Sequence, residues 1–260
     1  MTALLELRHV AKSFGGLRAV KDVSLTVTEG DYLGLIGPNG AGKTTLLNMM
    51  SGALPVTSGT ITMAGVDVTR WPSWRRSRAG ICRTYQSNRM LYAKTVGEHI
   101  TLALQAREPS VRSTVISGFR RRQNRTRQVR DALEPFGLRE LVDERADQLS
   151  HGHQRMLGIA MSVLACSVRP AVLLLDEPVT GMNDVEVNNA LSVFEYLRGE
   201  GFAIVLVEHN MKAVMSSVSR VYVLDAGLPL AEGKPRDIAA DPKVIEAYLG
   251  TTPMKVGPDA

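Results

Sequence analysis

The segment Gly37-Pro38-Asn39-Gly40-Ala41-Gly42-Lys43-Thr44 decides the fold, because it matches the GxxxxGK[ST] pattern of a phosphate-binding loop. An aliphatic run, 32–36, precedes it, and the helical-looking run 45–50 follows it. A strand before the loop and a helix after it are the context that this loop needs. Glycines let backbone N–H groups approach a phosphate closely, and the helix adds its positive N-terminal end. The segment therefore predicts a phosphate site in an α/β protein.

Each polar residue of the loop has an expected task. Lys43 would neutralise the β- and γ-phosphates of a nucleotide, and the hydroxyl of Thr44 would bind Mg²⁺. The residues expected to contact the nucleotide in this segment are Gly37, Pro38, Asn39, Gly40, Ala41, Gly42, Lys43, Thr44 and Thr45.

A second run, 172–178, is an aliphatic strand that ends in two acids. Asp176 would hold Mg²⁺ through its water shell, while Glu177 could polarise the attacking water as a general base. Such a strand end is also common in ordinary turns. Together with the phosphate loop, however, it favours catalysis.

Apolar patterns outside these motifs indicate the remaining architecture. The runs 5–10 and 23–27 alternate like antiparallel strands, whereas 32–36, 171–175 and 203–207 are continuously apolar, as in parallel strands covered on both faces. From about Asn88 to Ser162 the pattern is helical, with turn signals near Pro109, Gly118 and Pro135. We therefore expect an α/β core (1–87 and 163–250), an inserted helical lobe (88–162) and a flexible tail (251–260).

Composition limits the class of protein. The chain has 260 residues, of which 44% are hydrophobic, so it can bury a sizeable core. It shows no leader pattern and no apolar run long enough to span a bilayer, so we expect it to be cytoplasmic. Cys82 and Cys166 lack metal-ligand spacing, and we expect two reduced, idle thiols.

The formal charge is +5, and arginines gather in one stretch. They are Arg120, Arg121, Arg122, Arg125, Arg127 and Arg130. Nucleic-acid binding is one reading of such a stretch. Since no aromatic residues interleave for base stacking, a solvated face, or one that meets acidic lipids or a protein, is favoured. No nucleic-acid partner is expected.

The segment Leu149-Ser150-His151-Gly152-His153-Gln154-Arg155 separates the classes of phosphate-loop protein. It resembles the LSGGQ signature of ABC ATPases and stands shortly before the strand with the two acids. A guanine-reading Asn-Lys-x-Asp segment is absent, which argues against a GTPase. Ser150 and Gly152, at the start of a helix, would form an anion site. The resemblance implies that a second cassette supplies the phosphates, in a head-to-tail dimer that encloses two ATP molecules. His153 stands where the family usually has Gln or an acidic residue.

The resemblance assigns further residues. Gln86 is placed as the glutamine that contacts Mg²⁺ and the lytic water, and His209 as the histidine that contacts the γ-phosphate. Phe14 stands where an aromatic stacks on adenine, although a core position is also open. Asn183 replaces the commoner Asp of the loop that crosses the dimer, so that contact is in question.

Within that superfamily, the chain most resembles the ATP-binding subunits of branched-chain amino-acid importers. The matching phrases are 14–20, 83–86, 208–211 and 241–250. The resemblance implies two membrane-spanning permease subunits, an extracytoplasmic solute-binding protein that acts indirectly, and a place on the cytoplasmic face of the inner membrane. The coupling helix of a permease would bind near Ser87 to Tyr92.

Other functions stay open at this point. Related subunits serve urea or amide uptake, and a related cassette serves lipopolysaccharide export. A soluble ABC ATPase that acts on nucleic acid or ribosomes would use the arginine stretch, but it commonly carries two cassettes or a long coiled coil. A catalytically quiet, regulatory cassette conflicts with the presence of Lys43, Glu177 and His209.

Overall fold

Two long antiparallel strands begin the folded chain, in a computed structural model that describes residues 3–84, 90–107 and 127–249. β1 (Ala3–Phe14) pairs on one side with β2 (Leu17–Thr28) and on the other with β4 (Ser58–Met63), which pairs in turn with β5 (Val66–Asp67). The alternating runs at 5–10 and 23–27 lie in β1 and β2, so the prediction of an antiparallel N-terminal sheet is confirmed.

The second sheet carries the phosphate loop. Its strand order is β10-β9-β3-β8-β7-β6, and all neighbours are parallel except β10, which is antiparallel to β9. The strands are β3 (Tyr32–Ile36), β6 (Ile81–Arg83), β7 (Ala171–Asp176), β8 (Phe202–Val207), β9 (Arg220–Asp225) and β10 (Leu228–Gly233). The three continuous apolar runs are therefore parallel strands, as predicted.

Alternation along β8 shows why those runs are apolar throughout. Phe202, Ile204 and Leu206 belong to one buried cluster, together with side chains of the helical part of the chain. Ala203, Val205 and Val207 belong to a second cluster, which joins β1, β2 and the helix after the phosphate loop. Successive side chains of a strand point to opposite faces, so a strand buried on both faces needs apolar residues at every position.

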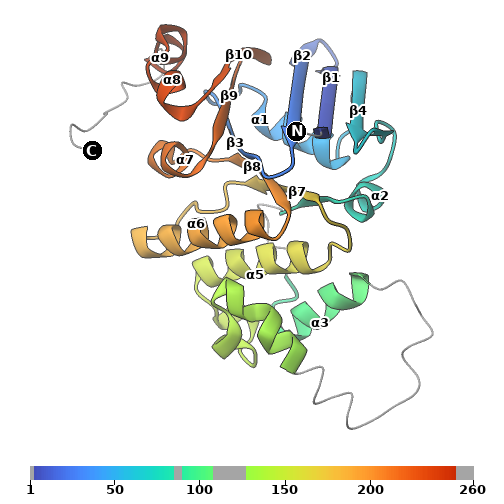
Figure 1. Ribbon diagram of the computed structural model, residues 1–260, viewed down its shortest axis with the longest axis vertical. Coiled ribbons are helices and arrows are strands. Elements are labelled where there is room, and N and C mark those ends of the chain that lie inside the picture. Colours follow the sequence, from blue (N-terminus) through green and yellow to red (C-terminus); the bar gives the residue numbers. More distant parts are fainter. Residues whose placement is uncertain (1–2, 85–89, 108–126, 250–260) are drawn as a thin grey trace.

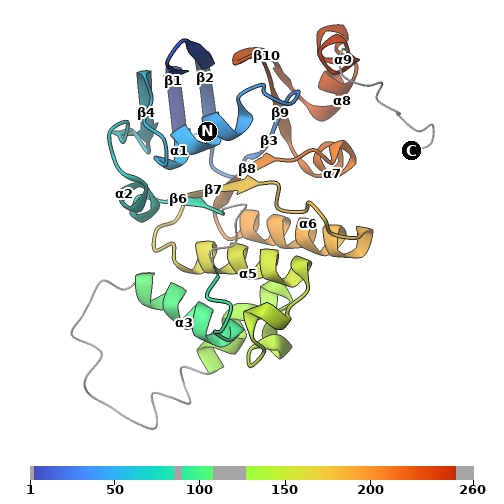
Figure 2. The ribbon, with the colours of Figure 1, turned by 180° about the vertical axis from the view of Figure 1, so that it is seen from behind.

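Helices lie on both faces of the second sheet (Figures 1 and 2). The helices are α1 (Lys43–Ser51), α2 (Ser73–Arg78), α3 (Val96–Arg107), α5 (His151–Leu164), α6 (Asp184–Gly199), α7 (Met211–Ser217), α8 (Pro235–Ala239) and α9 (Pro242–Leu249). α1 lies between the second sheet and the antiparallel sheet, and α5 and α6 lie on the opposite face of the second sheet. Short 3₁₀ turns lie at Glu134–Phe136, Arg139–Leu141 and Ala146–Gln148. α3 lies at the end of the molecule remote from β1 and β2. No helix in the described ranges is long and apolar enough to cross a membrane.

The described residues test only some of the predictions made from the sequence. α5 continues through Ser162 to Leu164, so the predicted lobe boundary falls inside a helix. The tail, the turn signals at Pro109 and Gly118, and four of the arginines (120, 121, 122 and 125) lie outside the described residues. Of the remaining arginines, Arg130 pairs with Asp143 at 3.0 Å. Cys82 and Cys166 are both buried and free.

Candidate nucleotide site

The loop between β3 and α1 needs its glycines for two different reasons. Gly37 and Gly42 have φ values of 150° and 102°, and a Cβ atom would lie 2.0 Å from the Leu224 carbonyl oxygen or 2.6 Å from that of Ala19. The neighbouring backbone therefore allows no side chain there. Gly40, with φ 80°, has open space around it. Its left-handed conformation favours glycine, and the space leaves its backbone accessible to a phosphate.

Lys43 lies inside the curve of this loop. Its Nζ donates to the carbonyl oxygens of Gly37 and Pro38, at 2.7 and 2.9 Å, and the residue is 6% exposed. Burial lowers the pKa of the Lys43 ammonium, and the charges of Glu177 and Asp176 act in the opposite direction. The ammonium and both acids of the β7 end thus share one site. An ammonium held at the loop can pair with phosphate oxygens.

Asp176, the last residue of β7, is held by an arginine. Its Oδ2 lies 3.2 Å from a terminal nitrogen of Arg83, on the adjacent strand β6. The other terminal nitrogen of Arg83 donates to Asn48 and Ser51 of α1. Burial raises the pKa of the Asp176 carboxyl, and the Arg83 guanidinium opposes that rise. The acid is therefore fixed on one side by the strand that leads to Gln86.

The residues present fit a magnesium ion. The Oδ1 atom of Asp176 is buried and has no hydrogen-bond partner among the described residues. Thr44, at the start of α1, is exposed. A hydroxyl, one carboxylate oxygen and water make an oxygen-only donor set, which suits Mg²⁺. Within the described part of the chain no group of three or more His, Cys, Asp or Glu side chains offers a transition-metal cage.

Glu177 and His209 meet at the ends of β7 and β8. His209 Nε2 lies 3.0 Å from Glu177 Oε1, and the two side chains are 49% and 24% exposed. Glu177 has a φ of 50°, an uncommon conformation for a residue with a Cβ atom. Its N–H donates to Val207 at 2.8 Å, and its carbonyl accepts from Arg155 at 2.7 Å. A solvent-accessible carboxylate beside an imidazole can accept a proton from water and pass it on.

Buried Glu208 organises the two loops that carry this pair. Its Oε1 accepts from the Val179 N–H at 2.8 Å, and its Oε2 accepts from the His209 N–H at 3.1 Å. The side chain thus joins the loop after β7 to the loop after β8. Burial raises the pKa of Glu208, and these backbone N–H groups act against the rise.

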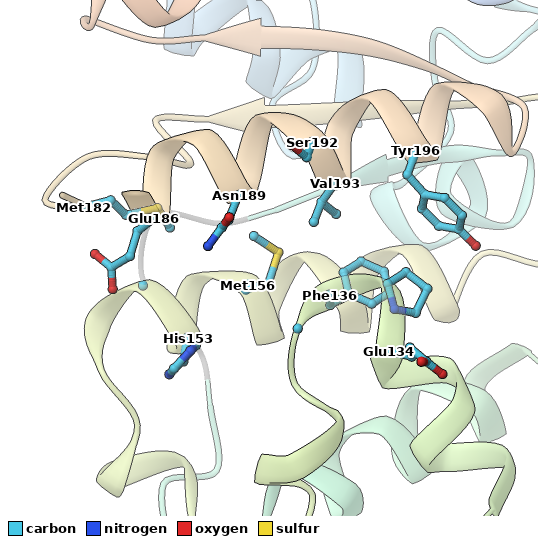
Figure 3. A pocket seen from close by; sticks show the side chains of 13 residues that line it. Glu134, Phe136, His153, Met156, Met182, Glu186, Asn189, Ser192, Val193 and Tyr196 are labelled. Atoms are coloured by element: carbon cyan, nitrogen blue, oxygen red, sulfur yellow. The ribbon is translucent and has the colours of Figure 1, made fainter. Parts of the chain in front are cut away.

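Ser150 caps α5, as its position at a helix start predicts. Its Oγ accepts from the His153 N–H at 3.2 Å. α5 therefore begins at His151, and its first turn includes Gly152 and His153. The apolar cavity of about 600 Å³ between α5 and α6 begins at the same helix end, because Gly152 and His153 line it, and Met156 and Val193 point into it (Figure 3). A phosphate would bind at the helix end rather than against those side chains.

The other predicted residues occupy separate places. Asn183 is the N-cap of α6 and forms a capping box with Glu186, a task that Asp would also perform. Phe14 ends β1 and is 47% exposed, which excludes the core alternative, and the Lys12 ammonium lies 5.2 Å from its ring. Gln86 lies outside the described residues.

Sequence reasoning gave no role to three residues that contact the site. Arg83, Arg155 and Tyr248 were only parts of matching phrases or of the signature segment. Tyr248 accepts a hydrogen bond from the Gly37 N–H, and burial raises its pKa to about 12. It joins α9 to the phosphate loop. Only the three-dimensional contact reveals this, because 211 positions separate the two residues.

Fold and site define a phosphate-loop ATPase of the cassette type. The family model described as ABC transporter matches residues 20–180. The model described as branched-chain amino acid ATP-binding cassette transporter matches 229–252. A protein of Salmonella typhimurium, "High-affinity branched-chain amino acid transport ATP-binding protein LivG", is 38% identical and covers 95% of this chain and 98% of its own length. BraF of Pseudomonas aeruginosa, with the corresponding description, is 36% identical with the same coverage.

Solved structures agree with these relatives. The crystal structure of the ADP conformation of MJ1267, an ATP-binding cassette of an ABC transporter, has a TM-score of 0.82 at 26% identity, over 96% of this chain and 100% of that one. A dimeric cassette, MJ0796, shares the fold with a TM-score of 0.75. The chain therefore belongs to the ABC transporter family, as an ATP-binding and ATP-hydrolysing subunit.

Proposed function

We propose that this chain powers the uptake of branched-chain amino acids, by binding and hydrolysing MgATP at the site between β3, β7 and β8. The paired ends of β7 and β8 carry the proposal, because they bring Glu177 and His209 to 3.0 Å. A carboxylate in that place suits a general base, and an imidazole beside it suits a γ-phosphate contact.

The site residues then have separate roles. The phosphate loop and Lys43 bind the phosphates, Phe14 stacks on the adenine, and Thr44 and Asp176 hold Mg²⁺, which draws charge from the transferred phosphoryl group. Glu177 accepts a proton from the attacking water, and His209 orients Glu177 and contacts the γ-phosphate. Gln86 contributes to the metal and water contacts. Ser150 and Gly152 bind the ATP of a second cassette.

The subunit works with partners. A helix N-terminus capped by Ser150 presents N–H groups and the positive end of the helix dipole, to which the phosphates of another cassette, identical or homologous, could bind in a head-to-tail pairing. We place the subunit at the cytoplasmic face of the inner membrane. Two membrane-spanning permeases, and an extracytoplasmic binding protein that acts through them, complete the importer. The core (1–87 and 163–250) binds nucleotide, and the inserted lobe (88–162) transmits its state to the permeases.

The solute assignment rests on the relatives, since LivG and BraF are described as branched-chain amino acid transport proteins. The test is uptake of labelled leucine, isoleucine and valine by cells that lack redundant importers and carry wild-type protein or Glu177→Gln, with labelled urea alongside. We expect the variant to lose amino-acid uptake by about 100-fold or more, as removal of a general base does, and urea uptake to stay unchanged. Amino-acid uptake equal in both strains would overturn the solute assignment.

A matched control keeps the catalytic assignment separate from the solute. Glu177→Gln should still bind ATP, because the amide preserves the shape of the side chain. Equilibrium binding of labelled ATP to purified variant and wild type should therefore agree within about twofold. If the variant also hydrolyses ATP in the assembled complex at the wild-type rate, Glu177 is not the base.

A further inference from the structure

Arg83 joins three elements around the proposed magnesium site. It ends β6, and its guanidinium donates to Asp176 of β7 at 3.2 Å, to Asn48 of α1 at 2.5 Å and to Ser51 of α1 at 3.0 Å. Its backbone carbonyl accepts from the Ser162 hydroxyl of α5 at 3.2 Å. One residue thus ties the acid to the phosphate-loop helix and to the signature helix.

The arginine and the acid are both removed from water. Their side chains are 7% and 2% exposed. A buried carboxylate needs a positive partner, because the interior solvates its charge poorly. Arg83 occupies Oδ2, whereas Oδ1 has no hydrogen-bond partner in the described part of the chain. The two oxygens are therefore in different situations, one paired and one available.

Loss of the guanidinium would have two opposing effects on metal binding. Without it the carboxylate can rotate, and fixing one side chain on binding costs little. The carboxylate would also lose its counter-charge, and an unpaired buried charge is among the most destabilising defects in a protein. The second effect is the larger, so a cation that reaches the site should bind more tightly when Arg83 is absent.

We infer that Arg83 is the resident counter-ion of Asp176, a positioning residue that holds Oδ2 and leaves Oδ1 for the water shell of Mg²⁺. The inference rests on the proposed function, since it presupposes a nucleotide-bound metal at Asp176. Arg83 pairs with the carboxylate and holds its orientation when no nucleotide is bound. Arg83 also sets the Mg²⁺ concentration that half-saturates the site. Through Asn48 and Ser51 it holds the acid at a fixed position relative to α1.

The test measures Mg²⁺ binding rather than turnover. Thermal unfolding of the purified full chain is followed at saturating ADP while Mg²⁺ is titrated, and is repeated with ADP and EDTA. We expect Arg83→Met to unfold at a lower temperature than wild type without ligand. The half-saturating Mg²⁺ concentration of the variant should be about tenfold lower than that of wild type. The change in unfolding temperature that ADP causes in the presence of EDTA should be the same in both proteins. Arg83→Lys retains a cation and should stay within about threefold of wild type.

Arg220→Met is the matched control, because Arg220 forms another inward-lying arginine–aspartate pair, with Asp31 at 2.8 Å. It should lower the unfolding temperature without changing the half-saturating Mg²⁺ concentration. If Arg83→Met yields no folded protein, Arg83→Gln gives the same comparison. A half-saturating Mg²⁺ concentration in the neutral Arg83 variant equal to or above that of wild type overturns the inference. Absence of any Mg²⁺-dependent stabilisation in wild type contradicts instead the proposed metal site.

Discussion

Glu177, the proposed base, is held in a backbone conformation that few residues adopt. A left-handed φ costs a residue with a Cβ atom about 1–2 kcal/mol. Two hydrogen bonds, from Arg155 to its carbonyl and from its own N–H to Val207, offset that cost. Because Arg155 lies on α5, a movement of that helix would act directly on the backbone of Glu177. The chemistry and the signature segment are thus in physical contact.

Glu208 should make the stability of the protein depend on pH. Burial raises its pKa, so between the ordinary value of 4.5 and the raised one the folded state binds more protons than the unfolded state. The free energy of unfolding then decreases as pH rises through that window. Glu208→Gln removes the titration, and it also removes one of two acceptors for backbone N–H groups, at a cost of about 1–3 kcal/mol.

We therefore expect Glu208→Gln to be less stable than wild type at about pH 5, and the difference to narrow towards about pH 8. Urea unfolding at several pH values measures it. Glu140→Gln, at an exposed position, should follow the wild-type pH dependence. A gap between Glu208→Gln and wild type that widens with rising pH would show that the pKa of Glu208 is lowered on folding.

Sequence could reveal the residues of the site whose signals are local. The phosphate loop and the acids of β7 are contiguous, so their chemistry is visible in short windows. Arg83 and Asp176 are 93 positions apart, and their contact exists only because β6 and β7 are neighbours in the sheet. The antiparallel edge strand β10 was not predicted from the sequence either. None of its residues is fully buried, so its sequence does not alternate clearly between apolar and polar residues.

Ser150 caps α5 and, in the proposed function, also binds the ATP of the opposing cassette. Substitutions can separate these two roles. As an N-cap it satisfies the His153 N–H, and Ser150→Ala should lose about 1 kcal/mol of stability. Asp caps a helix as well as Ser does, so Ser150→Asp should keep wild-type stability. Its negative charge would repel the phosphates of ATP on the opposing cassette. We expect both variants to lower ATP hydrolysis by the assembled transporter, by about tenfold or more.

Thermal unfolding of the isolated chain and ATPase assays of the assembled complex test this pair. Ser192→Ala, on the exposed side of α6, controls for loss of a hydroxyl. Near-wild-type hydrolysis by Ser150→Asp would show that Ser150 is a structural cap alone.

At the scale of the molecule, the hydrophobic core of the described residues consists of two buried clusters, one on each face of the second sheet. One joins α1 and the antiparallel sheet to the central strands, and the other joins those strands to α3, α5 and α6. Since the strands of the second sheet belong to both clusters, α1 packs against one face of that sheet and α5 and α6 against the other. The predicted lobe boundary at 162 lies inside α5, which suits a helix that belongs to both parts.

We propose that the residues just after 85–89 form the surface that contacts a membrane partner. Leu91 and Tyr92 are 54% and 51% exposed. The segment is anchored by His99, which is 1% exposed and accepts from the Leu91 N–H at 3.1 Å, while its Nδ1 lies 2.8 Å from the Thr95 carbonyl. A neutral imidazole with its proton on Nδ1 satisfies both contacts. One apolar and one aromatic side chain are therefore presented to solvent on a fixed support, where a partner could cover them.

The double variant Leu91→Asp, Tyr92→Asp should fold like wild type, because neither side chain is buried. The affinity of the isolated chain for ATP should stay within about twofold of wild type. Assembly with the membrane subunits should fall by about tenfold or more, since a docking helix would have to desolvate two carboxylates. Co-purification with the permeases and solute uptake measure the loss. Trp74→Gln, at an exposed apolar residue of α2, is the control and should assemble normally. Intact assembly of the double variant would place the coupling surface elsewhere on the lobe.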